Sequence, residues 1–137
     1  MDTSEATHFL KEFHERRKLN DADALLEFFT DDAEFSIAGE TRDNSIALRV
    51  GGPGAFAELL RGLVSDWEWI NVDFKTIATD GDTLIARYFL TIHHVPADQT
   101  LTTDVVDIME MRDGKVASMR QFVDTAHLSA IALGDNP

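Results

Sequence analysis

Residues 67–122 decide the fold, and they read WEWINVDFKTIATDGDTLIARYFLTIHHVPADQTLTTDVVDIMEMRDGKVASMRQF. Apolar and polar residues alternate along this stretch, which is the pattern of β-strands that bury one face. Asp80-Gly81 and Asp113-Gly114 interrupt the alternation, and Asp-Gly is a strong signal for a two-residue hairpin turn. Residues 96–99 interrupt it once more. The stretch therefore predicts four antiparallel strands joined by three consecutive hairpins.

Helices are expected ahead of these strands. Thr3 or Ser4 can cap a first helix, Asn20 or Asp21 a second, and Pro53 suits the first turn of a third. The apolar residues behind each start recur at helical spacing, namely Phe9, Leu10 and Phe13, then Ala22, Leu25, Leu26 and Phe29, then Phe56, Leu59, Leu60, Leu63 and Val64. The N-terminal part of the chain is therefore predicted to hold three helices.

The segment between the second and third helix is less regular. Phe35 and Ile37 fit a short strand, and residues 38–52 are expected to form a loop. Because helices and strands occupy separate parts of the chain, their order predicts an α+β fold. Strands of about twelve residues exceed the usual five or six, so the sheet is expected to curve strongly. Its concave side, covered by the helices, is predicted to hold an apolar pocket.

Size and charge narrow the function. A chain of 137 residues predicts one domain spanning 1–137. It carries 12 Lys and Arg against 25 Asp and Glu, a net charge of −13, so neither nucleic acid nor a membrane surface is an expected partner. The absence of cysteine excludes disulfides and thiolate metal sites. No apolar run resembles a signal peptide or membrane span, so a cytoplasmic location is expected.

A strand register follows if both Asp-Gly turns contain two residues and the third loop contains four. The face expected to meet the helices carries Trp67, Trp69, Leu84, Ala86, Tyr88, Leu90, Ile92, His94, Leu101, Val105, Asp107, Met109, Met111, Val116, Arg120 and Phe122. The outer face carries Ile70, Val72, Phe74, Ile85, Arg87, Phe89, His93, Asp104, Val106, Ile108, Glu110, Arg112, Met119 and Gln121. Because this outer face is too apolar for a fully hydrated surface, a homodimer through it is predicted. A monomer with scattered exposed apolar residues is the alternative.

Several short motifs carry a family resemblance. They are residues 25–35 (LLEFFTDDAEF), 52–54 (GPG), 107–116 (DIMEMRDGKV) and 122–126 (FVDTA). In their order and spacing they resemble the SnoaL-like or ketosteroid-isomerase-like proteins of the NTF2-like superfamily, over nearly the whole chain. The resemblance implies a cone-shaped barrel in which three N-terminal helices pack on a strongly curved, mainly antiparallel sheet. It also implies a deep pocket and usually a dimer.

The resemblance says less about the reaction, since this fold carries isomerases, dehydratases, polyketide cyclases, epoxide hydrolases and proteins without known catalysis. The isomerase mechanism uses a carboxylate base together with a tyrosine and a protonated aspartic acid that donate to an enolate oxygen. The base position falls on Ile37 and the tyrosine position on Phe13, so neither group is retained. The aspartic acid position falls on Asp107 when one residue is deleted at the Asp113-Gly114 turn.

Asp107 is the central candidate residue, and two interpretations of it remain open. Among Val105, Met109 and Met111 its carboxyl would lose water, which raises the pKa and suits proton transfer near neutral pH. Alternatively Arg120, expected opposite on the neighbouring strand, would form an ion pair that keeps the carboxylate charged. In that case Asp107 and Arg120 could together bind an anion, a carbonyl group or a water molecule.

Two further residues are candidates for catalysis beside Asp107. Tyr88 shares its predicted face and could replace the missing phenol as a hydrogen-bond donor, although strand tyrosines are more often core residues. His94 shares the face near the open hairpin end and could act as acid or base. The predicted ligand-binding residues are Arg120, Trp67, Trp69, Phe13, Phe35, Phe56, Val105, Met109 and Phe122, with a purely structural role in the core or an interface as the alternative for the aromatic ones.

No metal site and no cofactor are predicted. His93 and His94 are neighbours on a strand and point to opposite faces, so they cannot readily share an ion. His8 and His14 lie on the first helix and are expected at the surface. Asp32 and Asp124 stand at element ends, where capping or turn hydrogen bonds are their expected role.

Two functions from different classes follow. The leading hypothesis is a small-molecule enzyme that performs cofactor-free acid/base chemistry, of the isomerase, cyclase, dehydratase or hydrolase type, on an apolar cyclic or polyketide-like substrate. Asp107 would be central, with Tyr88 or His94 assisting. The alternative is a non-catalytic ligand-binding or dimeric scaffold domain, which the absence of a base at Ile37 and of a tyrosine at Phe13 favours. A pocket without any carboxyl group in its wall would favour the alternative.

Overall fold

The computed structural model describes residues 1–39, 46–52 and 54–133 of the chain. Along the sequence its elements are α1 (Thr3–Lys18), α2 (Ala22–Leu26), β1 (Phe29–Ile37), β2 (Leu48–Gly51), α3 (Ala55–Asp66), β3 (Trp67–Asp80), β4 (Thr83–His94), β5 (Gln99–Arg112), β6 (Lys115–Phe122) and α4 (Thr125–Ala132). Helices and strands remain largely separate along the chain, which confirms the α+β class.

Side-chain caps account for the starts of the helices. Asp2 caps α1, one residue earlier than predicted, and forms a capping box in which Glu5 N donates to its carboxylate at 2.8 Å. Asp21 caps α2 as predicted, with Ala24 N donating to Asp21 Oδ1 at 3.2 Å. The third predicted helix is present as α3, whereas its expected first residue, Pro53, lies outside the described residues.

Two elements were not expected from the sequence. Residues Leu48–Gly51, placed in a loop by the sequence, form the short strand β2, which pairs antiparallel with β1. Thr125–Ala132 forms the helix α4, so the helices are not confined to the N-terminal part of the chain. Asp124 caps α4 by accepting a hydrogen bond from His127 N at 3.1 Å, which confirms its predicted capping role.

All six strands belong to one sheet in the order β2-β1-β6-β5-β4-β3. Only the β1–β6 pair is parallel, and every other neighbouring pair is antiparallel. The turns between β3 and β4 and between β5 and β6 have two residues each, as predicted. The loop between β4 and β5 has the predicted four residues, but it covers 95–98 rather than 96–99 because His94 pairs with Gln99. The β4–β5 register thereby gives Tyr88 and Asp107 the same face, as predicted.

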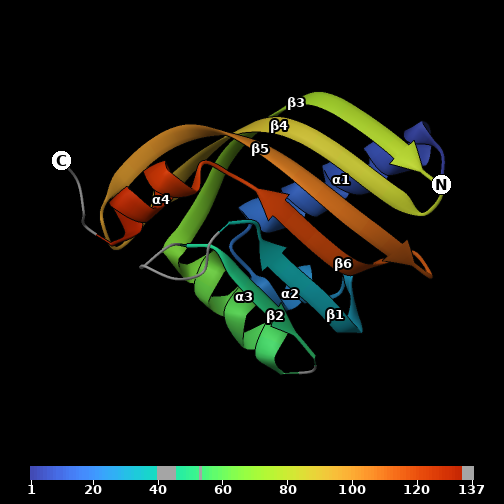
Figure 1. Ribbon diagram of the computed structural model, residues 1–137, viewed down its shortest axis with the longest axis horizontal. Helices are drawn as coiled ribbons and strands as arrows, with labels where there is room; N and C mark the ends of the chain where they lie inside the picture. The colour runs from blue at the N-terminus through green and yellow to red at the C-terminus, as the bar shows by residue number, and fades with distance from the viewer. Residues whose placement is uncertain (40–45, 53, 134–137) are drawn as a thin grey trace.

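The long strands curve over the helices. Figure 1 shows β3, β4 and β5 sweeping across the molecule in one arc, with α1 behind them and α3 beneath. The arc does not close into a full barrel, since β2 and β3 remain as the two edges of the sheet. Apolar side chains from the helices and from the concave face form one core, which includes Leu10, Leu25, Leu60, Leu84 and Met109. The concave face is thus the buried face.

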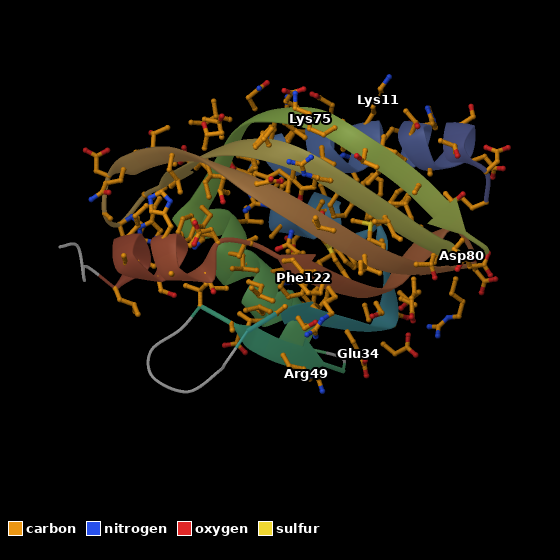
Figure 2. The ribbon with its side chains drawn as sticks, turned by 45° about the horizontal axis from the view of Figure 1, so that its top comes forward. Lys11, Glu34, Arg49, Lys75, Asp80 and Phe122 are labelled. Atoms are coloured by element: carbon orange, nitrogen blue, oxygen red, sulfur yellow. The ribbon has the colours of Figure 1, made fainter. Side chains whose placement is uncertain are left out.

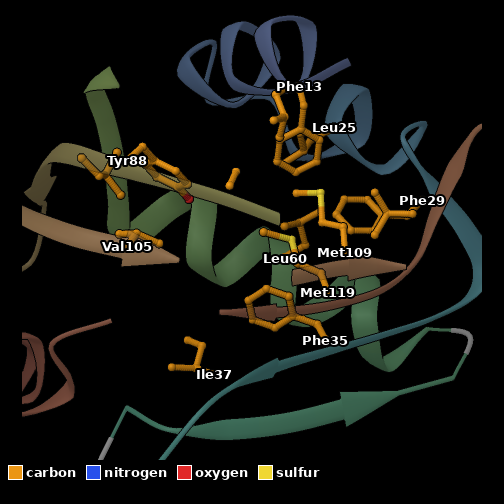
Figure 3. Close-up of a cluster of buried hydrophobic side chains, with 14 of the residues drawn as sticks. Phe13, Leu25, Phe29, Phe35, Ile37, Leu60, Tyr88, Val105, Met109 and Met119 are labelled. Atoms are coloured by element: carbon orange, nitrogen blue, oxygen red, sulfur yellow. The ribbon is translucent and has the colours of Figure 1, made fainter. Parts of the chain in front are cut away.

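A β-bulge in β6 overturns part of the predicted register. Glu110 pairs with Ser118 while the next residue, Met111, pairs with Val116, so Ala117 is an extra residue in β6. One extra residue exchanges the two faces of everything beyond it. Met119 and Gln121 therefore point inward, and Arg120 and Phe122 point outward, the reverse of the prediction. Figure 3 shows Met119 among the buried side chains.

Bulges also change the register of β3. The pairing with β4 skips Ile70 and then Lys75, so each is an extra residue in β3. Trp67 and Trp69 point inward as predicted, but between the bulges at Ile70 and Lys75 the faces exchange. Phe74, predicted on the outer face, instead packs inward with its ring centroid 5.8 Å from that of Tyr88. The first bulge thus adds an aromatic wall behind Tyr88.

None of the described helices is both long enough and apolar enough to cross a membrane.

The outer face of the sheet carries the apolar residues on which the predicted homodimer depends. Phe122 is 42% exposed and lies over the middle of this face (Figure 2), while Ile70 is 51% exposed. Ile85, Phe89, Val106 and Ile108 are half-buried beside them. Phe122 and Ile70 stay exposed among the described residues, and the homodimer through this face stays a prediction.

The dimer can be tested at Ile108, which lies near the centre of the outer face. In a symmetric dimer, Ile108→Asp would bring like charges together and bury them, so we expect a dimer of the 15.3 kDa chain to dissociate. Light scattering of the wild type and the variant measures the mass. Leu19→Asp is the matched control because Leu19 is exposed at the end of α1. A wild-type mass of one chain contradicts the prediction.

Candidate functional site

A cavity of about 360 Å³ lies between the helices and the concave face of the sheet. Its wall is mainly apolar, and apart from the two tryptophan indoles the polar side chains among the described lining residues are Arg17, Thr103 and Gln121. The apolar part of the wall consists of Phe13, Leu25, Phe29, Phe35, Ile37, Ile46, Ala47, Leu48, Leu60, Leu63, Leu90, Ile92, Val105, Met119, Val123 and Leu128. Figure 3 shows Phe13 and Leu25 pointing from the helices toward Phe35 and Ile37, with Tyr88 and Val105 to one side. This composition suits a compact apolar ligand with few polar groups.

Tyr88 and Asp107 form a hydrogen-bonded pair at the polar end of this interior. Tyr88 lies on β4 and Asp107 on β5, diagonal to each other on the same face. The Tyr88 hydroxyl donates to Asp107 Oδ2 at 2.6 Å, and both side chains are completely buried. Asp107 Oδ1 has no hydrogen-bond partner among the described residues. The pair is thus only partly satisfied by the protein.

Burial raises the pKa of both groups in this pair. Loss of water raises the pKa of Asp107 from 3.8 to about 7, against the opposing effect of the Tyr88 hydroxyl and the nearby Gln121 side chain. Burial, followed by the nearby Asp107 carboxylate, raises the pKa of Tyr88 well above 10.0. Near neutral pH the phenol therefore keeps its proton, while the carboxyl group exchanges readily between its two forms. Such a carboxyl group can act as acid or base.

Asp107 lies just beyond the cavity wall rather than in it, and no described lining residue is a carboxylate. Its neighbours on the same face, Val105 and Gln121, do line the cavity. Gln121 stands directly opposite Asp107 on β6, in the place expected for Arg120. Arg120 instead lies on the outer face, where its Nη1 donates to Ser36 Oγ at 3.3 Å. The predicted ion pair between Asp107 and Arg120 is therefore wrong, and the cause is the extra residue Ala117.

Arg17 brings a positive charge to the same end of the interior. It lies in the last turn of α1, and its Nη2 donates to Leu63 O at 3.2 Å and to Trp67 O at 2.7 Å. These carbonyls belong to the C-terminal end of α3, which carries a partial negative charge. The guanidinium carbon also lies 5.1 Å from the ring centroid of Trp69. Burial lowers the pKa of Arg17 to about 10, so it remains protonated at neutral pH.

His14 is buried beside this group, which corrects its predicted position at the surface. Only 2% of it is exposed, and neither ring nitrogen has a hydrogen-bond partner among the described residues. Its ring centroid lies 4.8 Å from that of Tyr88 and 5.0 Å from those of Trp69 and Phe74. Burial, followed by the charges of Lys18 and Arg17, lowers its pKa to about 3. His14 is therefore neutral throughout the physiological range.

His94 is buried at the far end of β4, away from Asp107. It lies eight residues along β4 from Ala86, the partner of Asp107, which corresponds to roughly 26 Å of strand. Its Nδ1 accepts a hydrogen bond from Ala97 N at 3.2 Å, and its ring packs 4.3 Å from that of Trp67. This arrangement stabilises the β4–β5 loop. An assisting role beside Asp107 is not compatible with that distance.

The remaining predicted ligand-binding residues divide into three groups. Those that line the cavity are Phe13, Phe35, Trp67, Trp69 and Val105. Met109 and Phe56 are buried in the core instead, where the Phe56 ring packs 4.7 Å from that of Phe29. Phe122 lies on the outer face because of the β6 bulge.

Four residues of this interior were not predicted from the sequence as site residues, namely Arg17, Gln121, Thr103 and His14. A signal for two of them exists, since Leu10, Phe13, His14 and Arg17 follow the i, i+3, i+4, i+7 spacing of one helix face. Thr103 falls between the inward-facing Leu101 and Val105, so the alternation of β5 places it inside. Gln121 had no such signal, because its orientation depends on the bulge at Ala117.

Within the described ranges, no group of three or more His, Asp or Glu side chains is arranged to hold a metal ion.

Comparison with known proteins identifies the family and the fold. The family model for the SnoaL-like domain matches residues 8–119. No curated protein matches the sequence. Among solved structures, a Bacillus subtilis protein provisionally described as an isomerase superposes with a TM-score of 0.81 at 18% identity, covering 98% of this chain and 97% of that chain. An NTF2-like protein from Burkholderia xenovorans LB400 superposes with a TM-score of 0.71 at 25% identity, covering 96% and 98%. An LEH-like epoxide hydrolase from M. tuberculosis superposes with a TM-score of 0.69 at 20% identity, with the same coverage of 96% and 98%.

The raised pKa of Asp107 predicts a specific pH dependence of stability. Between pH 3.8 and about 7 the folded protein holds a proton on this carboxyl group that the unfolded chain releases. The contribution of Asp107 to the free energy of unfolding therefore falls as the pH rises through this window. We expect Asp107→Asn to gain stability relative to the wild type over the same window, by up to roughly 1.4 kcal/mol per pH unit. Urea unfolding at a series of pH values measures the difference, and a difference that is constant with pH contradicts the assignment.

For His14 we expect the contribution to the free energy of unfolding to change with pH in the opposite direction. Below pH 6.5 the unfolded chain binds a proton on His14 that the folded protein excludes down to about pH 3, so the contribution of His14 to stability rises with pH. His14→Phe should therefore stabilise the protein most at acid pH. Above pH 6.5 a constant gain of about 1–3 kcal/mol should remain, because two unpaired buried nitrogens are removed. The same unfolding series tests this, with His8→Phe as the control at an exposed position of the same helix.

Proposed function

The chain belongs to the SnoaL-like domain family, and on that premise we propose that it is a small-molecule enzyme performing cofactor-free acid/base chemistry in the cytoplasm. The substrate class is an apolar, cyclic or polyketide-like molecule that fits the cavity of about 360 Å³. The observation that carries the proposal is the buried hydrogen bond between Tyr88 and Asp107, which lies next to that cavity.

In this proposal Asp107 is the group that moves a proton. Its carboxylate form accepts a proton from a carbon or oxygen atom of the substrate, and its acid form returns the proton to another atom. Tyr88 is a positioning residue, because its hydroxyl proton already binds Asp107 Oδ2. It holds that oxygen in place, and Oδ1, which has no partner among the described residues, is left to receive the proton.

Gln121 controls the access of a substrate to Asp107 in this proposal. It lines the cavity and stands opposite Asp107 on β6, so its side chain must turn aside before a bound molecule reaches the carboxyl group. Once displaced, its amide can donate to a substrate oxygen on which negative charge develops. The apolar residues around this end exclude water, which strengthens that interaction.

A solvent-exchange experiment tests the proposal without knowledge of the natural substrate. The bicyclic ketone 1-tetralone in D2O reports proton transfer at the carbon beside its carbonyl group by NMR. We expect the wild type to accelerate this exchange, with a rate that rises with pH up to about 7 as Asp107 ionises. Asp107→Asn should lower the catalysed rate about 100-fold, within the usual contribution of a general base.

Two further variants show whether the loss of exchange is specific to the Asp107 carboxyl group. Tyr88→Phe should slow the exchange less than Asp107→Asn and shift its pH profile, because the phenol only positions the carboxyl group. Asp104→Asn is the matched control, since Asp104 lies on the same strand but pairs with Arg87 at 2.8 Å on the outer face. Equal rates for the wild type and Asp107→Asn would remove the catalytic role of Asp107.

A second candidate function is ligand binding without catalysis. The specific observation in its favour is that the described cavity wall contains Ile37 and Phe13 but no carboxylate. Under this proposal 1-tetralone would broaden or shift the signals of wall residues such as Phe35 and Val105 in protein NMR spectra, whereas no exchange would be accelerated. The same sample therefore distinguishes the two candidates.

A further inference from the structure

Arg17 is a buried cation in the wall of a mainly apolar cavity. Only 5% of the residue is exposed, and it lines the cavity beside Trp67 and Trp69. Among the described residues no carboxylate lies within salt-bridge distance of its guanidinium group. Buried charges in proteins are normally paired, because an isolated one loses its hydration without compensation. The position of Arg17 therefore requires a physical explanation.

The contacts of Arg17 satisfy one side of the guanidinium group and leave the other side open. Its Nη2 donates to both Leu63 O and Trp67 O, where the end of α3 supplies partial negative charge. Its Nη1 is equally buried but has no hydrogen-bond partner among the described residues. A buried donor without an acceptor costs about 1–3 kcal/mol, and more when the group is charged.

The surroundings of Nη1 define what would satisfy it. Tyr88 is close enough for its phenol to influence the titration of Arg17, but the phenol oxygen accepts no hydrogen bond from Nη1. Thr103 and Gln121 also line the cavity, but neither side chain accepts a hydrogen bond from Nη1. A molecule in the cavity that carries an acceptor can satisfy Nη1, since Arg17 lines the cavity wall.

We propose that Arg17 binds the carboxylate of the ligand, so that the natural ligand is a compact, mainly apolar monocarboxylic acid. This inference rests on the proposed ligand-binding role of the cavity and adds a carboxylate to the ligand. One cation in an apolar wall matches one anionic group, with the apolar body of the ligand packed toward Phe35 and Ile37. A polyanion is disfavoured by the net charge of −13, and a cationic ligand is repelled by Arg17 itself.

A pair of probes of the same shape tests the inference. The probes are 2-naphthoate and its uncharged amide, 2-naphthamide, and isothermal titration calorimetry measures their dissociation constants. We expect the wild type to bind naphthoate at least about tenfold more tightly, because a charge-assisted hydrogen bond is roughly twice as strong as a neutral one. Arg17→Met should abolish this preference and leave the affinity for naphthamide within about twofold of the wild-type value.

Arg16→Met is the matched control, since it removes the same charge from the neighbouring position of α1. Arg16 lies outside the cavity, with its guanidinium carbon 5.3 Å from the ring centroid of Phe28. This variant should keep the preference for naphthoate. Equal binding of the two probes by the wild type overturns the role of Arg17 but leaves the cavity as a ligand site. Binding of neither probe overturns the proposed ligand site together with this inference.

A measurement on the wild type covers the case in which Arg17→Met does not fold, since Arg17 also links α1 to the end of α3. The ¹⁵N-resolved guanidinium signals of the arginines report a new acceptor directly. Naphthoate should shift the Arg17 Nη signal and leave that of Arg61, an exposed arginine of α3 paired with Asp23, unchanged. Naphthamide should produce a much smaller shift. Absence of any shift with naphthoate at saturation contradicts the proposal.

Discussion

A carboxyl group placed in the middle of a buried strand has to be accommodated by the residues around it, and much of this molecule can be understood from that constraint on Asp107. The hydrogen bond from Tyr88 satisfies one oxygen and joins β4 to β5 at the centre of the sheet. Gln121 faces the same group from β6. These contacts exist only in one strand register, since a slip of one residue would turn Asp107 toward the outer face. The site and the sheet therefore depend on each other.

The second ionisable group of the interior is kept apart from the first. Arg17 and Asp107 carry opposite charges, yet Tyr88 lies near both and the two do not form an ion pair. A direct pair would stabilise both charges and lower the pKa of the carboxyl group. Because the two groups are separated, the pKa of Asp107 stays near neutral pH, and Nη1 of Arg17 has no acceptor among the described residues. A mainly apolar interior with two polar groups that lack full hydrogen bonding at one end suits a ligand that is polar at one end only.

Regular elements could be predicted from the sequence, whereas elements with bulges or little local signal could not. The β4–β5 ladder has no bulge, so the alternation alone placed Tyr88 and Asp107 on one buried face. The bulge at Ala117 lies where no glycine or proline marks it, and the faces of Arg120 and Gln121 were consequently exchanged. His14 and Arg17 were missed for another reason, namely that ionisable residues on a helix are expected at the surface unless tertiary packing encloses them. The short strand β2 depends on its pairing with β1 and has little local signal of its own.

The extra residue in β6 also matters for how related chains are compared. A sequence alignment could match Arg120 with an inward-facing arginine of a relative without this bulge. The two residues would be identical, but their side chains would point to opposite faces of the sheet. If Ala117 paired regularly with Glu110 and the bulge were absent, Arg120 instead of Gln121 would stand opposite Asp107, with no substitution in either strand. Members of one family can in this way acquire different interior chemistry through a change in strand register alone.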